Sequence, residues 1–170
     1  LKEDAQKYGD DRRTLIVERK EARAIKEAEL TTVEPVTVVL SAGGWVRAAR
    51  GHDVDPVSLS YKAGDEFLSA DRVKTIQPSI FIDTRGRSYS LPANTLSSAR
   101  GQGEPLKGKL TTSEGARFRA VVMGSTDQKV LLASDAGYGF ITDLSNMVTK
   151  NTKGKAMLAF AKEGEALPPA

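Results

Sequence analysis

The sequence predicts a mainly β fold, in which about three propeller-like repeats of four short strands follow a short helical segment. One unit occurs three times: an apolar run, a polar four-residue turn that ends in glycine, and a second run that carries an aromatic residue. The glycines that close these turns are Gly44, Gly86 and Gly137. Each unit is typical of a β-hairpin, because glycine readily adopts the positive φ of such turns. From residue 36 onward, short apolar runs alternate with Gly, Pro, Asp and Asn, as in all-β domains.

The helical signals lie at the N-terminal end. Residues 1–8 are predicted to be the end of a helix that stops at Gly9. Residues 18–30 are rich in Glu, Ala, Lys and Arg, which favour a second helix, and a short strand is expected between the two at residues 14–17. Because the chain opens within a helix-forming run, we expect it to be part of a longer protein.

Pro35 marks the expected domain boundary, because proline prevents helix continuation. The helical segment then spans residues 1–35, and the β domain spans 36–170. Within the β domain the expected repeats are residues 36–72, 73–115 and 116–165. In the third repeat four short strands are expected within about 40 residues, as in a propeller blade; they cover residues 118–123, 129–134, 138–143 and 155–160.

Composition excludes several classes of site. The chain has no cysteine and one histidine, so thiolate chemistry and histidine metal clusters are excluded. No apolar run has the roughly 20 residues of a membrane span, and no signal peptide is evident, which favours a soluble protein. The net charge is +3. Residues 1–34 contain 8 Lys and Arg against 9 Asp and Glu, whereas residues 35–170 contain 17 against 13. The basic excess therefore lies on the repeats, where a polyanion could bind.

Two glycine-containing boxes repeat at one offset from the hairpins. The heptapeptide ARGQGEP (99–105) begins 13 residues after Gly86, and KNTKGKA (150–156) begins 13 residues after Gly137. A less regular copy, SYKAGDE (60–66), begins 16 residues after Gly44. Lys and Arg side chains bind phosphates without reading sequence, and glycines let backbone N–H groups approach a phosphate. The candidate DNA-binding residues are Arg47, Arg50, Arg85, Arg87, Arg100, Gly101, Gly103, Lys107, Lys109, Lys150, Lys153, Gly154 and Lys155.

The alternative for these residues is ordinary solvated charge with turn glycines. Trp45, Tyr89 and Tyr138 could stack on bases, although packing in the core is the expected role of all three. No catalytic site is predicted. His52 lacks a second histidine or cysteine, and the glycines of 99–105 lack the strand–turn–helix setting of a dinucleotide loop.

The repeats closely resemble the C-terminal region of the bacterial topoisomerase IV A subunit family, which is homologous to the gyrase A subunit. The resemblance covers essentially the whole chain. The segments that carry it are YGDDRRT (8–14), EPVTVVLSAGGWVR (34–47), RGHD (50–53), YKAGD (61–65), SSARGQGEPL (97–106) and SDAGYGF (134–140). The resemblance implies that residues 1–35 are the end of the breakage–reunion core and a linker. It also implies that residues 36–170 are part of a β-pinwheel, in which blades exchange strands.

In function, the resemblance implies that basic blade rims bind and bend duplex DNA and present it to the enzyme core for decatenation and relaxation. None of the three heptapeptides is the full gyrase box, QRRGGKG, so strong chiral wrapping is not expected. The expected partners are duplex DNA and, through other regions, a B subunit and a second A subunit. ATP and Mg belong elsewhere in that assembly, and the expected location is cytoplasmic and nucleoid-associated, which leaves peripheral membrane association of the parent enzyme open. A propeller-like scaffold that binds protein is the alternative.

Overall fold

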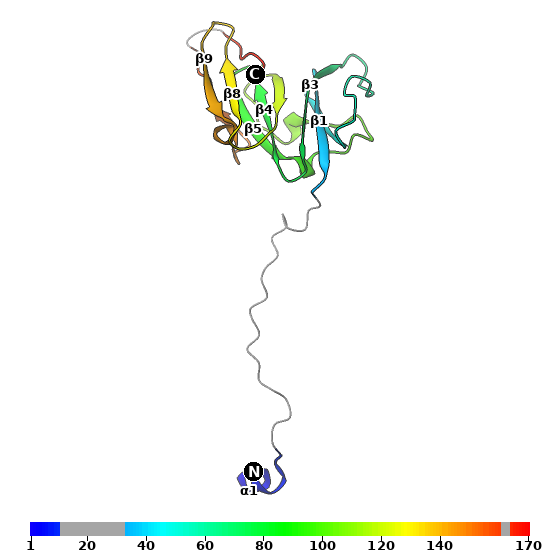
Figure 1. Ribbon diagram of the computed structural model, residues 1–170, viewed down its shortest axis with the longest axis vertical. Helices are drawn as coiled ribbons and strands as arrows, with labels where there is room; N and C mark the ends of the chain where they lie inside the picture. Colours follow the sequence, from blue (N-terminus) through cyan, green and yellow to red (C-terminus); the bar gives the residue numbers. More distant parts are fainter. Residues whose placement is uncertain (11–32, 161–163) are drawn as a thin grey trace.

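The computed structural model describes residues 1–10, 33–160 and 164–170 (Figure 1). The predicted N-terminal helix is confirmed as α1 (Lys2–Tyr8), which ends at Gly9 and buries no residue. Its acidic first turn and basic last turn complement the helix dipole. The strand expected at 14–17 and the helix expected at 18–30 lie outside the described residues.

Three antiparallel sheets make up the described β region. The first has the strand order β3-β1-β2-β6, the second has β10-β5-β4-β7, and the third pairs β8 with β9. The strands are β1 (Pro35–Ser41), β2 (Trp45–Arg50), β3 (Phe67–Lys74), β4 (Pro78–Asp83), β5 (Arg87–Pro92), β6 (Glu104–Pro105), β7 (Phe118–Val122), β8 (Lys129–Ala133), β9 (Gly139–Asp143) and β10 (Lys155–Ala156). Short 3-10 turns are η1 (Ala93–Thr95), η2 (Leu106–Gly108) and η3 (Leu144–Met147).

The three predicted hairpins are confirmed as β1–β2, β4–β5 and β8–β9. Their turns close at the predicted glycines, which have φ of +78° at Gly44, +70° at Gly86 and +81° at Gly137. The prediction from local turn chemistry therefore places each hairpin correctly.

The four strands expected for the third repeat do not form one sheet, as four strands of a simple blade would. A strand forms in all four ranges, although the one expected at 155–160 is only Lys155–Ala156. β7 pairs with β4 and β10 pairs with β5, so both complete the second sheet. Only β8 and β9 remain together. In the same way β6, which lies in the second repeat, completes the first sheet by pairing with β2. The hairpin of the first sheet thus receives the short strand β6 from the next repeat, and the hairpin of the second sheet receives β7 and β10 from the third repeat. This exchange links the repeats.

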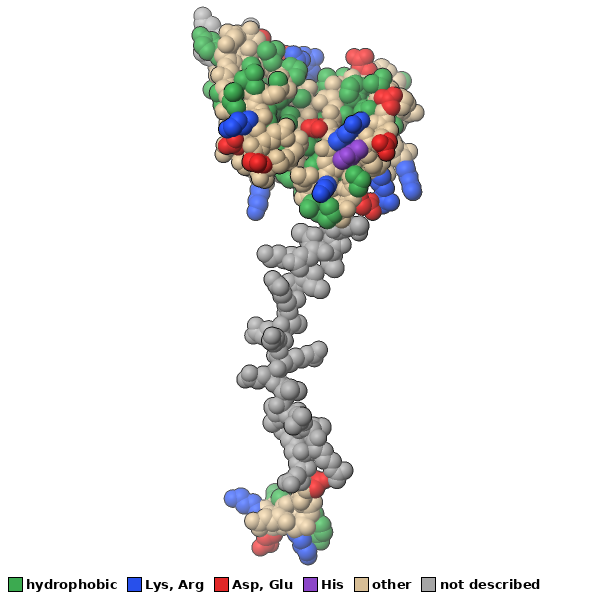
Figure 2. Space-filling view, in the orientation of Figure 1, with side chains coloured by type: hydrophobic (Ala, Val, Ile, Leu, Met, Phe, Trp, Pro, Cys, Tyr) green, Lys and Arg blue, Asp and Glu red, His purple; other side chains and the backbone are tan. Residues whose placement is uncertain are grey.

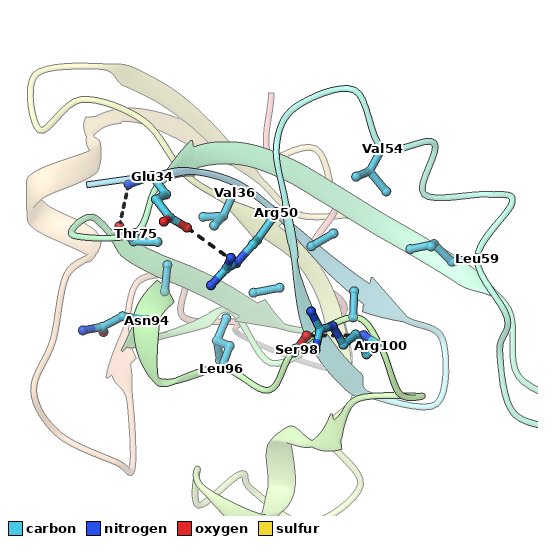
Figure 3. Close-up of a pocket in the computed structure, with 14 residues that line it drawn as sticks. Glu34, Val36, Arg50, Val54, Leu59, Thr75, Asn94, Leu96, Ser98 and Arg100 are labelled. Atoms are coloured by element: carbon cyan, nitrogen blue, oxygen red, sulfur yellow. Dashed lines mark hydrogen bonds and ion pairs between the residues drawn. The ribbon is translucent and has the colours of Figure 1, made fainter. Parts of the chain in front are cut away.

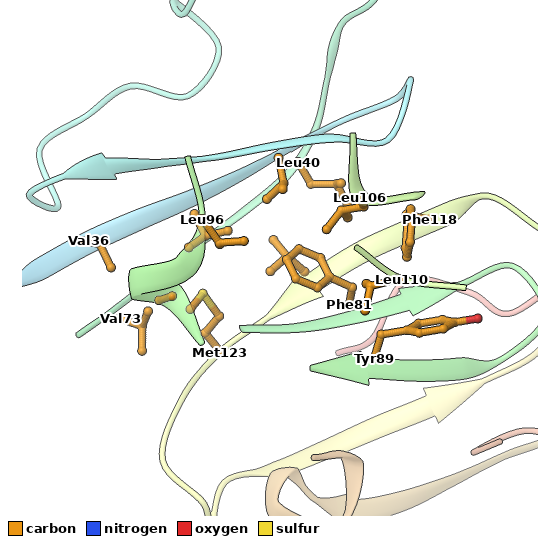
Figure 4. Close-up of a cluster of buried hydrophobic side chains, with 14 residues drawn as sticks. Val36, Leu40, Val73, Phe81, Tyr89, Leu96, Leu106, Leu110, Phe118 and Met123 are labelled. Atoms are coloured by element: carbon orange, nitrogen blue, oxygen red, sulfur yellow. The ribbon is translucent and has the colours of Figure 1, made fainter. Parts of the chain in front are cut away.

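Two hydrophobic clusters lie between the sheets. The larger one joins the first and second sheets around Phe118, whose ring meets Phe81 and Tyr89 edge to face at centroid distances of 6.2 and 5.8 Å (Figure 4). The smaller one joins the second and third sheets through Ile80, Val130 and other side chains of β4, β8 and η3. Each sheet therefore buries apolar surface against the next sheet, as expected for stacked repeats.

The expectation that all three hairpin aromatics pack in the core is correct only for Tyr89, which is fully buried. Trp45 is half-buried under the Lys62 ammonium, which lies 3.3 Å from the ring centroid. Tyr138 is 79% exposed, and Ile141 of β9 is 66% exposed. Among the described residues no strand pairs with the outer edge of β9, whereas β2 and β5 are covered there by β6 and β10. That missing cover explains why Tyr138 lies in solvent.

Candidate nucleic-acid interface

The boxes at 99–105 and 150–156, called here the first box and the second box, are equivalent structures. Each ends in a two-residue strand that covers the edge of a hairpin. In the first box Glu104 pairs with Val46, and in the second Lys155 pairs with Ser88. The equal offsets in sequence therefore reflect equal paths in space. Each box follows one hairpin along the chain but binds the edge of the preceding one.

Gly103 and Gly154 are required by this packing. Both have positive φ, +89° and +70°. A Cβ at Gly103 would lie 2.5 Å from the Val46 carbonyl oxygen, and one at Gly154 would lie 2.6 Å from Cε1 of Tyr89. The Gly154 N–H also donates to the Asn151 carbonyl at 2.9 Å, so it is already used within the turn. These two glycines therefore allow the boxes to pack closely against the edges of the sheets.

Gly101 has a different setting. No atom lies within 4 Å of the position of a Cβ there, and its φ is outside the positive region. Its carbonyl oxygen accepts a hydrogen bond of 3.2 Å from Nη1 of Arg47. Gly101 therefore makes a backbone contact that any residue could make.

Two of the candidate arginines anchor the boxes. Arg87 donates from Nε and Nη2 to the carbonyls of Lys153 and Gly154, both at 3.1 Å. Arg47 is only 4% exposed, donates from Nη1 to the Ser60 carbonyl at 2.8 Å, and stacks on Tyr61 at 4.6 Å. The structure thus places Arg47 in the interior, where it supports the first box without reaching solvent.

The exposed cations divide unequally between the boxes. Lys150, Lys153 and Lys155 are exposed on the second box, which contains no Asp or Glu. Arg85 is exposed in the β4–β5 turn, where the adjacent Gly86 carbonyl accepts hydrogen bonds from the amides at 157 and 158, just after that box. These four side chains, Arg85, Lys150, Lys153 and Lys155, form the basic edge of the second sheet.

The cations around the first box are partly neutralised. Arg100 and Lys107 are exposed, but Lys109 forms an ion pair of 2.8 Å with Glu104. Arg50, at the end of β2, lies 3.5 Å from Glu34. The first box is consequently the weaker candidate for contact with a polyanion.

The segment 60–66 is not a third copy of the box. Gly64 lies three residues before Phe67, and Gly115 lies three residues before Phe118. Phe67 and Phe118 hold the same register, opposite the last residues of β1 and β4. Residues 60–66 are therefore equivalent to the turn before β7, and this explains why their offset from the hairpin glycine differs from that of the boxes.

Asp65 in that segment holds the first hairpin turn. Its carboxylate accepts hydrogen bonds from Ser41 Oγ at 2.6 Å and from the amides of Gly43 and Glu66 at 2.7 and 2.9 Å. Burial raises the pKa of Asp65, but these hydrogen bonds and the nearby Arg47 guanidinium outweigh burial and hold the pKa below its ordinary value of 3.8. Asp65 is thus a structural carboxylate.

We expect the Asp65 carboxylate to stabilise the fold at neutral pH and to lose this effect in acid. The pKa of Asp65 is lower in the folded state than in the unfolded state. The stabilisation by the carboxylate is therefore fully present above the unfolded-state pKa, and it is lost as pH falls through the folded-state pKa. Asp65→Asn should lower the free energy of unfolding at pH 7 by roughly 1.5–3 kcal/mol, as for hydrogen bonds to a charged group. Urea denaturation of the wild-type chain and of Asp65→Asn at pH 7 and pH 3 measures this effect. The difference in their free energies of unfolding should be smaller at pH 3 than at pH 7. An equal difference at both pH values would contradict the structural role of the Asp65 carboxylate.

A cavity of about 650 Å³ lies beside β2, on the first sheet (Figure 3). Val36, Ala49 and Leu96 contribute apolar walls, Val54 and Leu59 face it from the loop 51–60, and Arg50 and Arg100 lie among the lining residues. This volume and lining are within the range of ligand-binding pockets.

No catalytic or metal centre is assembled in the parts of the chain that the structure describes. No group of three His, Cys, Asp or Glu side chains there could hold a metal ion. His52 Nε2 lies 3.2 Å from the Val73 carbonyl. Ser41 Oγ donates to Asp65 and accepts from the Trp45 N–H, and Ser134 Oγ donates to the Tyr138 carbonyl within its own turn. Within the same residues, no helix combines the length and apolar character needed to cross a membrane.

Comparison with known proteins identifies relatives of the whole chain. No protein-family model matches it. The DNA topoisomerase 4 subunits A of Escherichia coli K12 and Pseudomonas aeruginosa are 52% and 53% identical over 169 residues, which are 99% of this chain and 22% of each relative. The solved structure of the E. coli ParC C-terminal domain matches with a TM-score of 0.77 and 52% identity, over 80% of this chain and 56% of that one.

The chain thus spans about a fifth of the length of its curated relatives. The exchanged strands agree with the β-pinwheel fold that the sequence resemblance implies, and the ParC match covers most of the described sheets. The chain belongs to the topoisomerase IV A subunit family, and its β region is a β-pinwheel of the kind found in the C-terminal domain of that subunit.

Proposed function

We propose that this chain binds and bends duplex DNA through the basic edge of the second sheet, with the exposed cations of the first box contributing less. One observation carries the proposal: three exposed lysines stand on a box without acidic residues, and that box is fixed to the sheet by β-pairing and by Arg87. Because the backbone of this box is fixed to the sheet, less freedom is lost when its lysines bind phosphates, and lysines contact the DNA backbone without reading bases.

In the parent enzyme, this surface would present DNA segments to the topoisomerase core for decatenation and relaxation. The B subunit and a second A subunit would bind through other regions, where ATP and Mg would also act. The protein would work in the cytoplasm on nucleoid DNA. Support for this role comes from the family to which the chain belongs.

Binding measured as a function of salt tests the proposal. The chain is titrated with two duplexes of unrelated sequence between 50 and 200 mM salt, by fluorescence anisotropy. We expect similar affinities for both duplexes and a linear fall of log affinity with log salt, with a slope of about −0.9 per phosphate contact. A flat salt dependence, or no binding at low salt, would refute the proposal.

The alternative function is a scaffold that binds protein, and two observations favour it. The cavity beside β2 has apolar walls, and Figure 2 shows Lys and Arg side chains at several separate places on one face, with acidic side chains among them. A scaffold would bind a partner protein with little dependence on the lysines of the second box. The same titration separates the two functions, because only the DNA-binding function predicts steep salt dependence with bare duplex DNA.

A further inference from the structure

The two boxes differ in charge at one equivalent position. Glu104 directly follows Gly103, and it pairs with Val46, the second residue of β2. Lys155 directly follows Gly154, and it pairs with Ser88, the second residue of β5. The same place on the sheet edge therefore carries a carboxylate in the first box and an ammonium in the second.

A second equivalence concerns the lysine ammonium at each box. In the second box Lys155 Nζ donates to the Asn146 carbonyl at 2.6 Å. In the first box Lys109 Nζ donates to the Thr95 carbonyl, also at 2.6 Å. Thr95 and Asn146 occupy matching positions, each nine residues after its hairpin glycine, in η1 and η3. The same carbonyl thus binds an ammonium at both boxes, although a different lysine supplies it.

The first ammonium is neutralised and the second is not. Glu104 Oε1 accepts from Lys109 Nζ at 2.8 Å and from the Ser97 N–H at 2.9 Å. The side chains of Lys109 and Glu104 are only 32% and 27% exposed. Lys155, by contrast, is exposed and belongs to a box without acids. Glu104 and Lys109 therefore form an ion pair with no net charge to attract a ligand.

We propose that Glu104 determines which box contacts DNA, by keeping the Lys109 charge from phosphates so that binding concentrates on the second box. This inference rests on the proposed function. It adds that one residue, Glu104, decides how the DNA contacts are divided between the two boxes. To pair with Lys109, a phosphate near the first box would have to compete with the Glu104 carboxylate, which lies 2.8 Å from the ammonium. Removal of that one charge should add a phosphate contact, to Lys109, at the first box.

The test compares Glu104→Gln with Glu66→Gln in the salt titration described above. In Glu104→Gln the new amide side chain keeps an oxygen acceptor for the Ser97 N–H and loses only the charge. We expect Glu104→Gln to tighten binding by about five- to ten-fold at 0.1 M salt and to steepen the salt slope by about 0.9, which corresponds to one added phosphate contact. Glu104→Lys, which copies Lys155, should steepen the slope by about 1.8.

Glu66→Gln is the matched control. Glu66 is exposed at the start of β3, on the opposite edge of the same sheet from β6. Three strand spacings are about 14 Å, which exceeds the Debye length of about 10 Å at 0.1 M salt, so this variant should bind like the wild-type chain. If Glu104→Gln binds no better than Glu66→Gln while wild type binds with a steep slope, the inference is overturned and the proposed function stands. If wild type shows no salt-sensitive binding, both fail.

Discussion

Replacing Lys150, Lys153 and Lys155 with alanine should abolish most of the affinity for duplex DNA. All three are exposed on the second box, where no acid offsets them. If each lysine contacts one phosphate, three contacts are worth on the order of 10² to 10³ in affinity at 0.1 M salt. The loss should be the same for duplexes of different sequence, because these contacts read only the backbone. Fluorescence anisotropy with two unrelated duplexes measures it.

The matched control removes equal charge outside both boxes. Arg72, Lys74 and Lys129 are exposed on β3 and β8. Their triple replacement by alanine should weaken binding far less than replacement of the three box lysines. Equal losses from the two triple variants would mean that net charge alone drives binding, and loss on only one duplex would contradict backbone contact.

Gly154→Ala should cause a larger loss of stability than an alanine at any non-glycine position of the second box. A side chain at φ +70° costs about 1–2 kcal/mol, and overpacking adds about 1–3 kcal/mol, because the new Cβ would lie 2.6 Å from Tyr89 Cε1 and 2.8 Å from the Ser88 carbonyl. Tyr89 cannot easily move, since it is fully buried and donates from its hydroxyl to Asp83 Oδ2 at 2.8 Å. Thermal unfolding should shift down by roughly 10 °C for a chain of this size.

Gly101→Ala provides the control, because nothing lies within 4 Å of its Cβ position and its φ is not positive. It should unfold at nearly the temperature of the wild-type chain. Gly103→Ala should resemble Gly154→Ala, since its Cβ would lie 2.5 Å from the Val46 carbonyl oxygen. A Gly154→Ala protein as stable as Gly101→Ala would show that the box is not seated on β5 as described.

The hairpins could be predicted from the sequence because their signals are local. An apolar run, a turn and a closing glycine lie within a dozen residues, and the glycine requirement is a property of the turn itself. The exchange of strands is not local. β6 and β10 are two residues long and pair with hairpins more than 50 residues away, and no periodicity within so short a strand reveals its partner.

The candidate site was predictable to a similar extent. The repeated offset located both boxes, but the glycine in 60–66 suggested a third box, because a turn glycine before a strand has the same local pattern in both settings. Arg47 looks like any surface arginine in the sequence, and the fold buries it by bringing Ser60, Tyr61 and Gly101 against its guanidinium. The ion pair of Glu104 and Lys109 forms where the fold also brings Lys109 to the Thr95 carbonyl at the end of η1. The spacing of these residues in the sequence does not indicate that contact.

The measurement that tests the central claim most directly is the salt slope of DNA binding for the wild-type chain and for the variant with alanine at Lys150, Lys153 and Lys155. The slope counts phosphate contacts, so it separates lost contacts from a general loss of fold or affinity. If the second box binds DNA as proposed, the slope of the variant should be shallower by about 2.7, which is 0.9 for each of three lost contacts. Parallel slopes for the two proteins would contradict the claim.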